Sequence, residues 1–255
     1  MNRILFFYTF SFLVLANFCQ AEVCGKILKI QGDVEILRIK ETKDVRIGIK
    51  ATDQAPLQCD DIILTGRASR AKLKLGSTVV TMSSQSRLAA EEHNEKTHEP
   101  NLLSLMYGKI RALVKPRETG EKNLQINTST AVMGVRGTDL FVGFDPNTRL
   151  THQATIEGKV EVEQKVTGQK IMVDPGQQIK IEAHIAPDGE EIQAPLRAEP
   201  ISIKVVEQIR QASFIAKDDK EFATTEAVKI LGEPTKWLPP DEELPLDLRG
   251  MKNEF

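Results

Sequence analysis

The stretch Ala68–Met82, with the sequence ASRAKLKLGSTVVTM, contains a regular alternation of apolar and charged residues. Leu73 and Leu75 alternate with Lys72 and Lys74, so an extended chain would place the leucines on one face and the lysines on the other. Such alternation is typical of a half-buried β-strand. It favours an antiparallel sheet, a sandwich or a solenoid with one face in water. We therefore expect a mainly β protein.

The same period of two recurs along most of the chain, from Cys24 to about Glu182. It is seen in GKILKIQGDVEILRI, KIRALV, NLQINTST, ATIEGKVEVEQKV and QKIMVDPGQQIKIEA. Three runs open with a glycine, a charged residue and then valine or isoleucine, at Gly32, Gly108 and Gly158. We expect each glycine to occupy a turn that needs a positive φ. Their unequal spacing argues against a fixed-period repeat, and similar hairpin edges are the favoured explanation.

A denser glycine cluster lies in TSTAVMGVRGTDLFVGF, Thr128–Phe144. It lacks the Lys-Ser or Lys-Thr pair that follows the second glycine of a Walker loop. It also lacks the Gly-x-Gly-x-x-Gly spacing of a dinucleotide site. Because NLQINTS before it and DLFVGF after it are strand-like, we expect a turn between two strands. The turn comprises Gly134, Val135, Arg136, Gly137 and Thr138.

Several residues of this turn have an expected role. Gly134 and Gly137 would allow backbone angles that a Cβ disfavours. Thr138 would satisfy amide groups of the turn. Arg136 would either be buried against a carboxylate or project outward, and a carboxylate partner inside the fold is the first hypothesis. A fold-defining turn is favoured over a ligand contact, because glycines in strand connections are usually conformational.

The N-terminal segment, residues 1–21, has the pattern of a secretory signal peptide. An almost wholly apolar run, Ile4–Phe18, follows Arg3, and Ala21 is the small residue before the expected cleavage site. Retention as an anchor helix is the second alternative, and lipidation at Cys19 is the third. We expect export to the periplasm or cell envelope, with transient membrane contact through this segment alone.

Cleavage would leave two cysteines, Cys24 and Cys59, in the mature chain. In an exported chain two cysteines allow one disulfide without a leftover thiol. A bond between them would stabilise the fold by roughly 3–4 kcal/mol in the chain-entropy model. Two buried free thiols are the alternative, and export favours the disulfide.

The β pattern fades after residue 186, so we assign 22–186 to one β domain. Prolines then mark a linker, 187–200, before a helical region, 201–232, with apolar residues at helical spacing in two segments. The last part, 233–255, is expected to be extended or disordered. Within the β domain the polar segment Ala89–Asn101 is predicted to be an exposed loop.

The composition argues against several classes of function. The chain has 34 Lys and Arg against 36 Asp and Glu, a net charge of −2, without the concentrated basic face that nucleic-acid binding needs. Aromatic residues make up only 5%, which leaves little for stacking on sugars or bases. The four histidines fit no metal-ligand spacing, and no nucleophile elbow is present. We expect no catalytic residue, metal or cofactor, and hence no enzyme.

The segment Ile126–Val142, INTSTAVMGVRGTDLFV, resembles the central motif of the FecR-type domain family. LQCDDIILTGRASRAKLKLGSTVVTMSSQSRL and ATIEGKVEV resemble the segments that precede and follow it, so the resemblance covers about Gly25–Glu182. It implies an exported, all-β, β-helix-like module. In the named member of the family, the domain follows a cytoplasmic anti-sigma region and a membrane helix, and it relays a signal from an outer-membrane transporter. The motif implies no catalytic residue.

This chain departs from that arrangement, because only three residues precede its apolar segment. We therefore expect no cytoplasmic anti-sigma region and no sigma-factor control by the chain itself. The overall expectation is an antiparallel or β-helix-like FecR-type domain with a short C-terminal helical region. It would act as a non-enzymatic interaction or signal-sensing module, with an unidentified envelope protein as partner. A structural envelope protein or a polysaccharide-binding module is the alternative.

Overall fold

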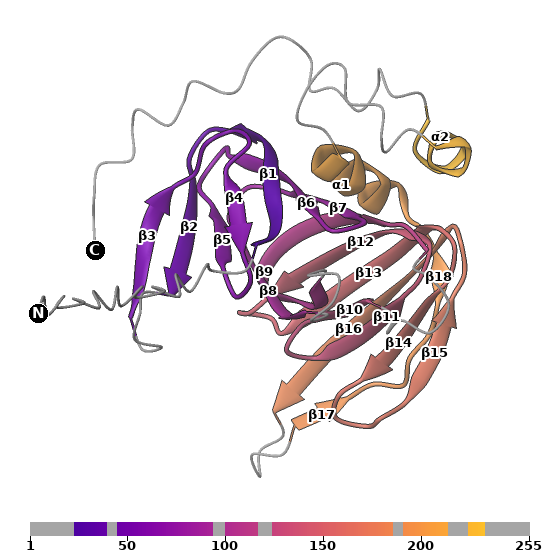
Figure 1. Cartoon of the computed structure of the whole chain (residues 1–255). Coiled ribbons are helices and arrows are strands. Elements are labelled where there is room, and N and C mark those ends of the chain that lie inside the picture. The colour runs from indigo at the N-terminus through magenta and orange to yellow at the C-terminus, as the bar shows by residue number, and fades with distance from the viewer. Residues whose placement is uncertain are drawn as a thin grey trace, which may run out of the picture.

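The computed structural model of the chain describes residues 23–39, 45–93, 100–116, 124–185, 191–213 and 224–232 (Figure 1). These residues form strands from Val23 to Pro200, followed by two short helices, so the mainly β prediction is confirmed. The predicted signal peptide and the predicted C-terminal tail lie outside the described residues. No helix in the described part of the chain is both long and apolar enough to cross a membrane.

Two mostly antiparallel layers contain nearly all of the strands. Sheet A consists, in order across the sheet, of β4 (Pro56–Gln58), β1 (Val23–Gln31), β6 (Arg70–Leu75), β7 (Thr78–Met82), β9 (Pro100–Val114), β12 (Thr138–Asp145), β13 (Leu150–Glu157), β16 (Gln177–Ile185) and β18 (Glu199–Pro200). Sheet B consists of β3 (Arg46–Lys50), β2 (Val34–Ile39), β5 (Ile62–Thr65), β8 (Ser86–His93), β9 again, β10 (Leu124–Asn127), β11 (Ala131–Val135), β14 (Val160–Gln164) and β15 (Lys170–Val173).

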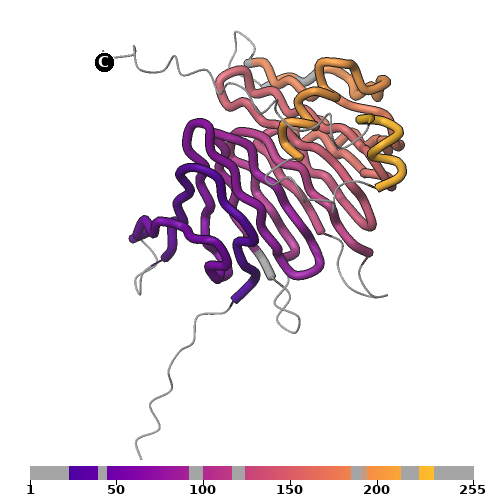
Figure 2. Tube along the Cα trace, turned by 90° about the horizontal axis from the view of Figure 1, so that it is seen from above, coloured from indigo at the N-terminus to yellow at the C-terminus, as the bar shows by residue number. Residues whose placement is uncertain are grey.

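Strand β9 belongs to both layers and joins them into one large sheet. Its first half pairs with β8 and, in parallel, with β10, whereas its second half pairs with β7 and β12. The chain alternates between the layers as it proceeds, and Figure 2 shows it advancing from the indigo strands at one end to the orange strands at the other. This advance resembles a solenoid, although neighbouring strands are mostly antiparallel.

The glycines that open the three similar runs lie where the chain passes between the layers. Gly32 separates β1 from β2, Gly158 separates β13 from β14, and Gly108 lies inside β9 where its pairing changes from sheet B to sheet A. Their φ values are 76°, 77° and 94°, as the prediction of positive φ requires. At Gly108 a Cβ atom would lie 2.5 Å from Cα of Ser86, so a side chain there is excluded by sterics as well.

The main hydrophobic core lies between the layers, as the alternation predicts. Leu73 and Leu75 of sheet A and Val160 and Val162 of sheet B are at most 1% exposed, whereas Lys74 on the opposite face is exposed. Burial of each of these side chains contributes about 1.5–3 kcal/mol relative to an exposed position. The hydrophobic effect therefore selects which face of each strand points inward.

Both helices pack on the outer face of sheet A (Figure 1). Helix α1 (Ile203–Ser213) and helix α2 (Thr225–Leu231) lie within the predicted helical region. Of the apolar stripe predicted for α1, residues Val205, Ile209 and Ala212 are buried, and they share a second hydrophobic cluster with Phe141 and Ile156 of the sheet. Sheet A is thus covered on both faces along part of its length.

Two predicted segments differ from the structure. The predicted linker carries two strands, β17 (Glu191–Gln193) and β18, and both pair with β16, so this part of the chain is attached to the sheets. The predicted exposed loop begins inside β8, where Ala89 and Ala90 are buried. Two alanines are small enough to pack in the core without giving the periodic signal that larger apolar residues provide.

Candidate functional site

The predicted turn is shorter than its sequence suggested, because Gly134 and Val135 end β11 and Thr138 begins β12. The motif therefore connects sheet B to sheet A through Arg136 and Gly137. Gly137 has a φ of 60°, and a Cβ atom on it would lie 3.0 Å from Cγ of Pro116. Gly134 has no positive φ, and a Cβ there would meet nothing closer than 4.0 Å, so the expected backbone role is wrong for this glycine.

Arg136 is exposed, so the hypothesis that it has a carboxylate partner inside the fold is wrong. The buried ion pair instead involves the next acidic residue, Asp139. Its carboxylate accepts hydrogen bonds from Nε and Nη2 of Arg111, at 2.9 and 2.6 Å, and both side chains are fully buried. Nη1 of Arg111 also donates to the hydroxyl of Ser213 in α1. Burial raises the pKa of Asp139, and the guanidinium group of Arg111 opposes that shift.

The hydroxyl of Thr138 does not satisfy the turn. It is buried and accepts or donates no hydrogen bond among the described residues. The methyl group of Thr138 instead packs against Gly158, which lies at the next crossing between the layers. A Cβ atom on Gly158 would lie only 2.9 Å from that methyl group, so the glycine leaves the space that Thr138 occupies. The motif is therefore a packing junction of the two layers.

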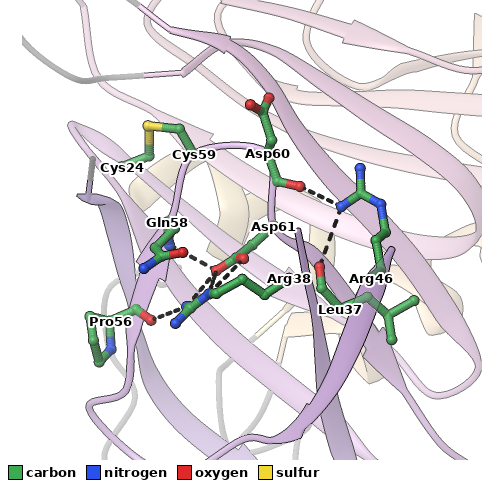
Figure 3. Close-up of polar contacts among 9 residues, drawn as sticks. All are labelled: Cys24, Leu37, Arg38, Arg46, Pro56, Gln58, Cys59, Asp60 and Asp61. Carbon is green, nitrogen blue, oxygen red and sulfur yellow. Dashed lines mark hydrogen bonds and ion pairs between the residues drawn. A yellow bond between two sulfur atoms is a disulfide. The ribbon is translucent and has the colours of Figure 1, made fainter. Parts of the chain in front are cut away.

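Cys24 and Cys59 form a disulfide, with Cα atoms 5.0 Å apart, at the first strands of the domain (Figure 3). Beside it, the carboxylate of Asp61 accepts from Nε and Nη2 of Arg38 at 3.0 and 2.7 Å, and from the backbone N–H of Gln58 at 2.8 Å. These bonds raise the pKa of Arg38. Because Arg38 and Asp61 bond to each other and to the backbone within the fold, we assign this pair a structural role.

A groove of about 620 Å³ opens on the outer face of sheet A, between that sheet and α1. The sheet A groove, as we call it, is lined by Arg70 of β6, Lys109 of β9, Gly143 of β12, His152 of β13 and Gln208 and Gln211 of α1. The turn after β12, residues 145–147, forms another wall. This volume lies within the range of about 300–1,000 Å³ that is typical of ligand sites.

Strand register explains why a groove exists at this place. On β12, Gly143 pairs with Lys109 on one side and with His152 on the other, so the three lie in one row across the sheet. Because neighbouring strands are about 4.8 Å apart, the two side chains flank the glycine at a separation of about 10 Å. Phe141 fills the next outward position on β12 and is buried under the helices. The glycine therefore leaves a gap where the helix cover ends.

His152 is held by neighbours that determine its tautomer. The amide nitrogen of Gln178 donates to Oε1 of Glu199 at 2.9 Å, which directs the amide oxygen toward Nε2 of His152 at 3.0 Å. Nε2 therefore carries the hydrogen, and the ring meets Phe141 edge to face with centroids 6.1 Å apart. Burial lowers the pKa of His152, so the neutral imidazole prevails at neutral pH.

The cations of the groove differ in their hydration. Arg70 is half-buried, and burial lowers its pKa, whereas Lys109 is exposed. One carboxylate, that of Asp145, belongs to the lining, and it already accepts a hydrogen bond from the backbone N–H of Asn147 at 2.9 Å. The groove is thus a partly apolar site whose lining includes the cationic side chains of Arg70 and Lys109 and one carboxylate. In the described part of the chain, no group of three or more His, Cys, Asp or Glu residues is arranged to hold a metal ion.

Sequence reasoning did not assign the groove. Lys109 and His152 are far apart in the chain, and each occupies an ordinary position in an alternating strand. One available signal was Gly143, a glycine inside the apolar strand DLFVGF, since such glycines often mark a close approach of another group.

Comparison with known proteins identifies the domain. Residues 61–161 match the family model described as FecR protein, so the chain contains a FecR domain, as the motif predicted. The match begins near the start of β5 and ends in β14. It therefore includes the crossing at Gly137, the Arg111–Asp139 pair and the sheet residues of the groove, but neither helix.

Two crystal structures of candidate anti-sigma factors from Parabacteroides distasonis ATCC 8503, at 1.65 and 2.50 Å resolution, are similar to 58% of this chain. The sequence identities are 19% and 20%, and the TM-scores are 0.43 and 0.44. The similar region covers 64% of each of those chains, slightly less than two thirds of their length. Among curated proteins, none matches the chain.

Proposed function

We propose that this chain is an exported, non-enzymatic signal-sensing module of the cell envelope, which senses through the sheet A groove and acts on a protein partner through its C-terminal helices. One observation carries the proposal: the groove is bounded by the FecR domain on one side and by Gln208 and Gln211 of α1 on the other. A molecule bound there would contact both parts. Its binding energy would therefore depend on where α1 lies.

Export is supported by two independent features. The apolar N-terminal segment has the pattern of a secretory signal, and Cys24 and Cys59 form a disulfide. Structural disulfides persist in oxidising compartments such as the periplasm and are rare in the cytoplasm. Both features favour an envelope location.

The helices provide a surface for a partner. Helix α1 buries one face on the sheet and leaves Ile203 90% exposed, although this side chain is large and apolar. Helix α2 contacts α1, and Nε of Arg210 donates to the carbonyl of Leu231 at 2.7 Å. A shift of α1 would therefore be transmitted to α2. The outer surface of the pair includes Lys229, whose side chain is 74% exposed.

Site-specific photo-cross-linking in intact native cells tests the proposal. A photoreactive residue replaces Lys229 on α2, and the matched control places it at Lys50 on β3, whose side chain is 82% exposed in the other sheet. We expect one envelope protein to be captured from position 229 and not from position 50. Filling the groove by Gly143→Leu is expected to change the yield of that product.

Two results would contradict the proposal. One is the absence of any product specific to position 229. The other is a product that forms equally in the Gly143→Leu background, because the groove would then have no influence on the helices. Retention of the purified chain on envelope polysaccharide, together with the absence of a protein product, would support the polysaccharide-binding alternative instead.

A further inference from the structure

We infer that the sheet A groove binds a small amphiphilic anion, a molecule with one anionic group on an apolar body. This inference rests on the proposed function and names the chemical class of the signal. The groove holds two kinds of surface side by side, cationic groups on the sheet and apolar side chains near the turn after β12. Each surface restricts the ligand in a different way.

The cationic part selects an anion. Arg70 on β6 and Lys109 on β9 both line the groove, and β7 lies between these two strands. The backbone N–H of Ser83, which directly follows β7, donates to the carbonyl of Lys109 at 2.9 Å. A half-buried guanidinium group has lost part of its hydration, so it interacts more favourably with a bound anion than a fully hydrated guanidinium group does. The one lining carboxylate, Asp145, points its Oδ1 at the N–H of Asn147 within its own turn.

The apolar part selects the body of the ligand. Tyr107 and Leu150, which are half-buried, provide the accessible apolar side chains of the groove, and the buried Phe141 and Phe144 also belong to its lining. Gly143 leaves the space between Lys109 and His152 open. A volume of about 620 Å³ accommodates one small organic molecule. An inorganic anion alone would leave most of the apolar lining in contact with water. A ligand with both features would satisfy the whole surface.

The two wall glutamines complete the site. Gln208 is half-buried and Gln211 is exposed on α1, and the amide of Gln211 also donates to Glu207 at 3.2 Å on the same helix. Amides donate and accept hydrogen bonds without adding charge, so they suit a polar linker between an anionic group and an apolar body. Binding would thus connect the sheet cations to α1.

Two fluorescent probes with closely related aromatic bodies test the ligand class on the purified full chain. 8-Anilinonaphthalene-1-sulfonate carries an anionic group, whereas N-phenyl-1-naphthylamine is neutral. We expect saturable one-to-one binding of the sulfonate and binding at least roughly tenfold weaker for the neutral probe, as loss of one charge-assisted contact implies. Lys109→Gln is expected to weaken sulfonate binding by roughly tenfold and to leave the neutral probe unchanged.

Steric and charge controls use matched positions. Gly143→Leu should abolish binding of both probes, and its first side-chain atom fits because a Cβ there meets nothing closer than 3.6 Å. Gly134→Ala on sheet B and Lys74→Gln on the same face of sheet A should have no effect. Circular dichroism of each variant checks folding. If Gly143→Leu is unfolded, the comparison of Lys109→Gln with Lys74→Gln decides by itself.

Equal affinity for both probes would overturn the inference, as would sulfonate binding that is insensitive to Lys109→Gln. Binding that survives in a folded Gly143→Leu variant would place the probe elsewhere and would also overturn it. These outcomes are distinguishable from failure of the proposed function. If cross-linking from α2 depends on the groove but the groove does not prefer the anionic probe, the sensing role would be supported and the ligand would belong to another chemical class.

Discussion

Replacing Asp139 with leucine should lower the free energy of unfolding of this domain by much more than the change in side-chain volume alone would. The substitution leaves the guanidinium group of Arg111 buried without its carboxylate partner. Both side chains are fully buried, and two hydrogen bonds of 2.9 and 2.6 Å join them. The hydroxyl of Ser213, which accepts from Nη1 of Arg111, is neutral and cannot replace the charge of the carboxylate.

The magnitude follows from the geometry. At an effective dielectric of about 20, two unit charges about 4 Å apart attract by roughly 4 kcal/mol. Breaking a buried pair by removal of one partner typically costs about 3–5 kcal/mol, because an uncompensated charge stays in the interior. Asp139→Leu and Arg111→Met should each cost that much. The double variant should cost less than either one, since its apolar side chains of similar volume need no solvation.

The assay is equilibrium unfolding in urea, followed by circular dichroism with the disulfide intact. With a slope of about 2 kcal/mol per M, each single substitution should lower the unfolding midpoint by roughly 1.5–2.5 M. An exposed pair provides the control. Lys170 and Glu163 are 3.1 Å apart, with side chains 55% and 37% exposed, and Glu163→Ala should leave the unfolding midpoint almost unchanged because water and salt screen an exposed pair.

A loss of stability in Asp139→Leu no larger than that in Glu163→Ala would contradict this prediction. The prediction also fails if the loss in the double variant equals the sum of the two single losses, because the double-mutant cycle would then show no coupling. A further check concerns α1. Since Arg111 contacts Ser213, Arg111→Met should also make α1 more susceptible to proteolysis than it is in the wild type.

Three further predictions follow from the same structure. Reduction of the Cys24–Cys59 disulfide, whose residues are 35 apart in the chain, should lower the free energy of unfolding by about 4 kcal/mol, measured in urea with and without dithiothreitol. Burial lowers the pKa of His152, so the unfolded chain takes up a proton on this imidazole at a higher pH than the folded chain does. The stability of the wild type should therefore fall as the pH drops below about 6.5, and it should fall less in His152→Gln. Thermal unfolding at several pH values measures both. Gly158→Ala should destabilise by about 1–3 kcal/mol, because φ is 77° and its Cβ would lie 2.5 Å from a carbonyl oxygen, whereas Gly134→Ala should change unfolding by under about 1 kcal/mol.

The motif shows how far sequence reasoning reaches. The pattern around Gly137 correctly indicated a connection between strands, and it identified the FecR domain. The arginine of the motif drew attention because it lies between two glycines, yet Arg136 is exposed and the buried charge is that of Asp139. Nothing local distinguishes these two residues, since the partner of Asp139 lies on β9, 28 positions earlier.

The amino-acid pattern was sufficient to predict which face of half-buried strands such as β6 and β14 points into the core, and it indicated the disulfide, the positive-φ glycines at the crossings and the two C-terminal helices. These features depend on residues near one another in the chain, where a period of two or 3.6 is visible directly. The register of β9, β12 and β13 becomes visible in the folded chain, and with it the partner of Asp139 and the row of Lys109, Gly143 and His152. Register is set by backbone hydrogen bonds and by packing between distant segments, so no local pattern encodes the groove.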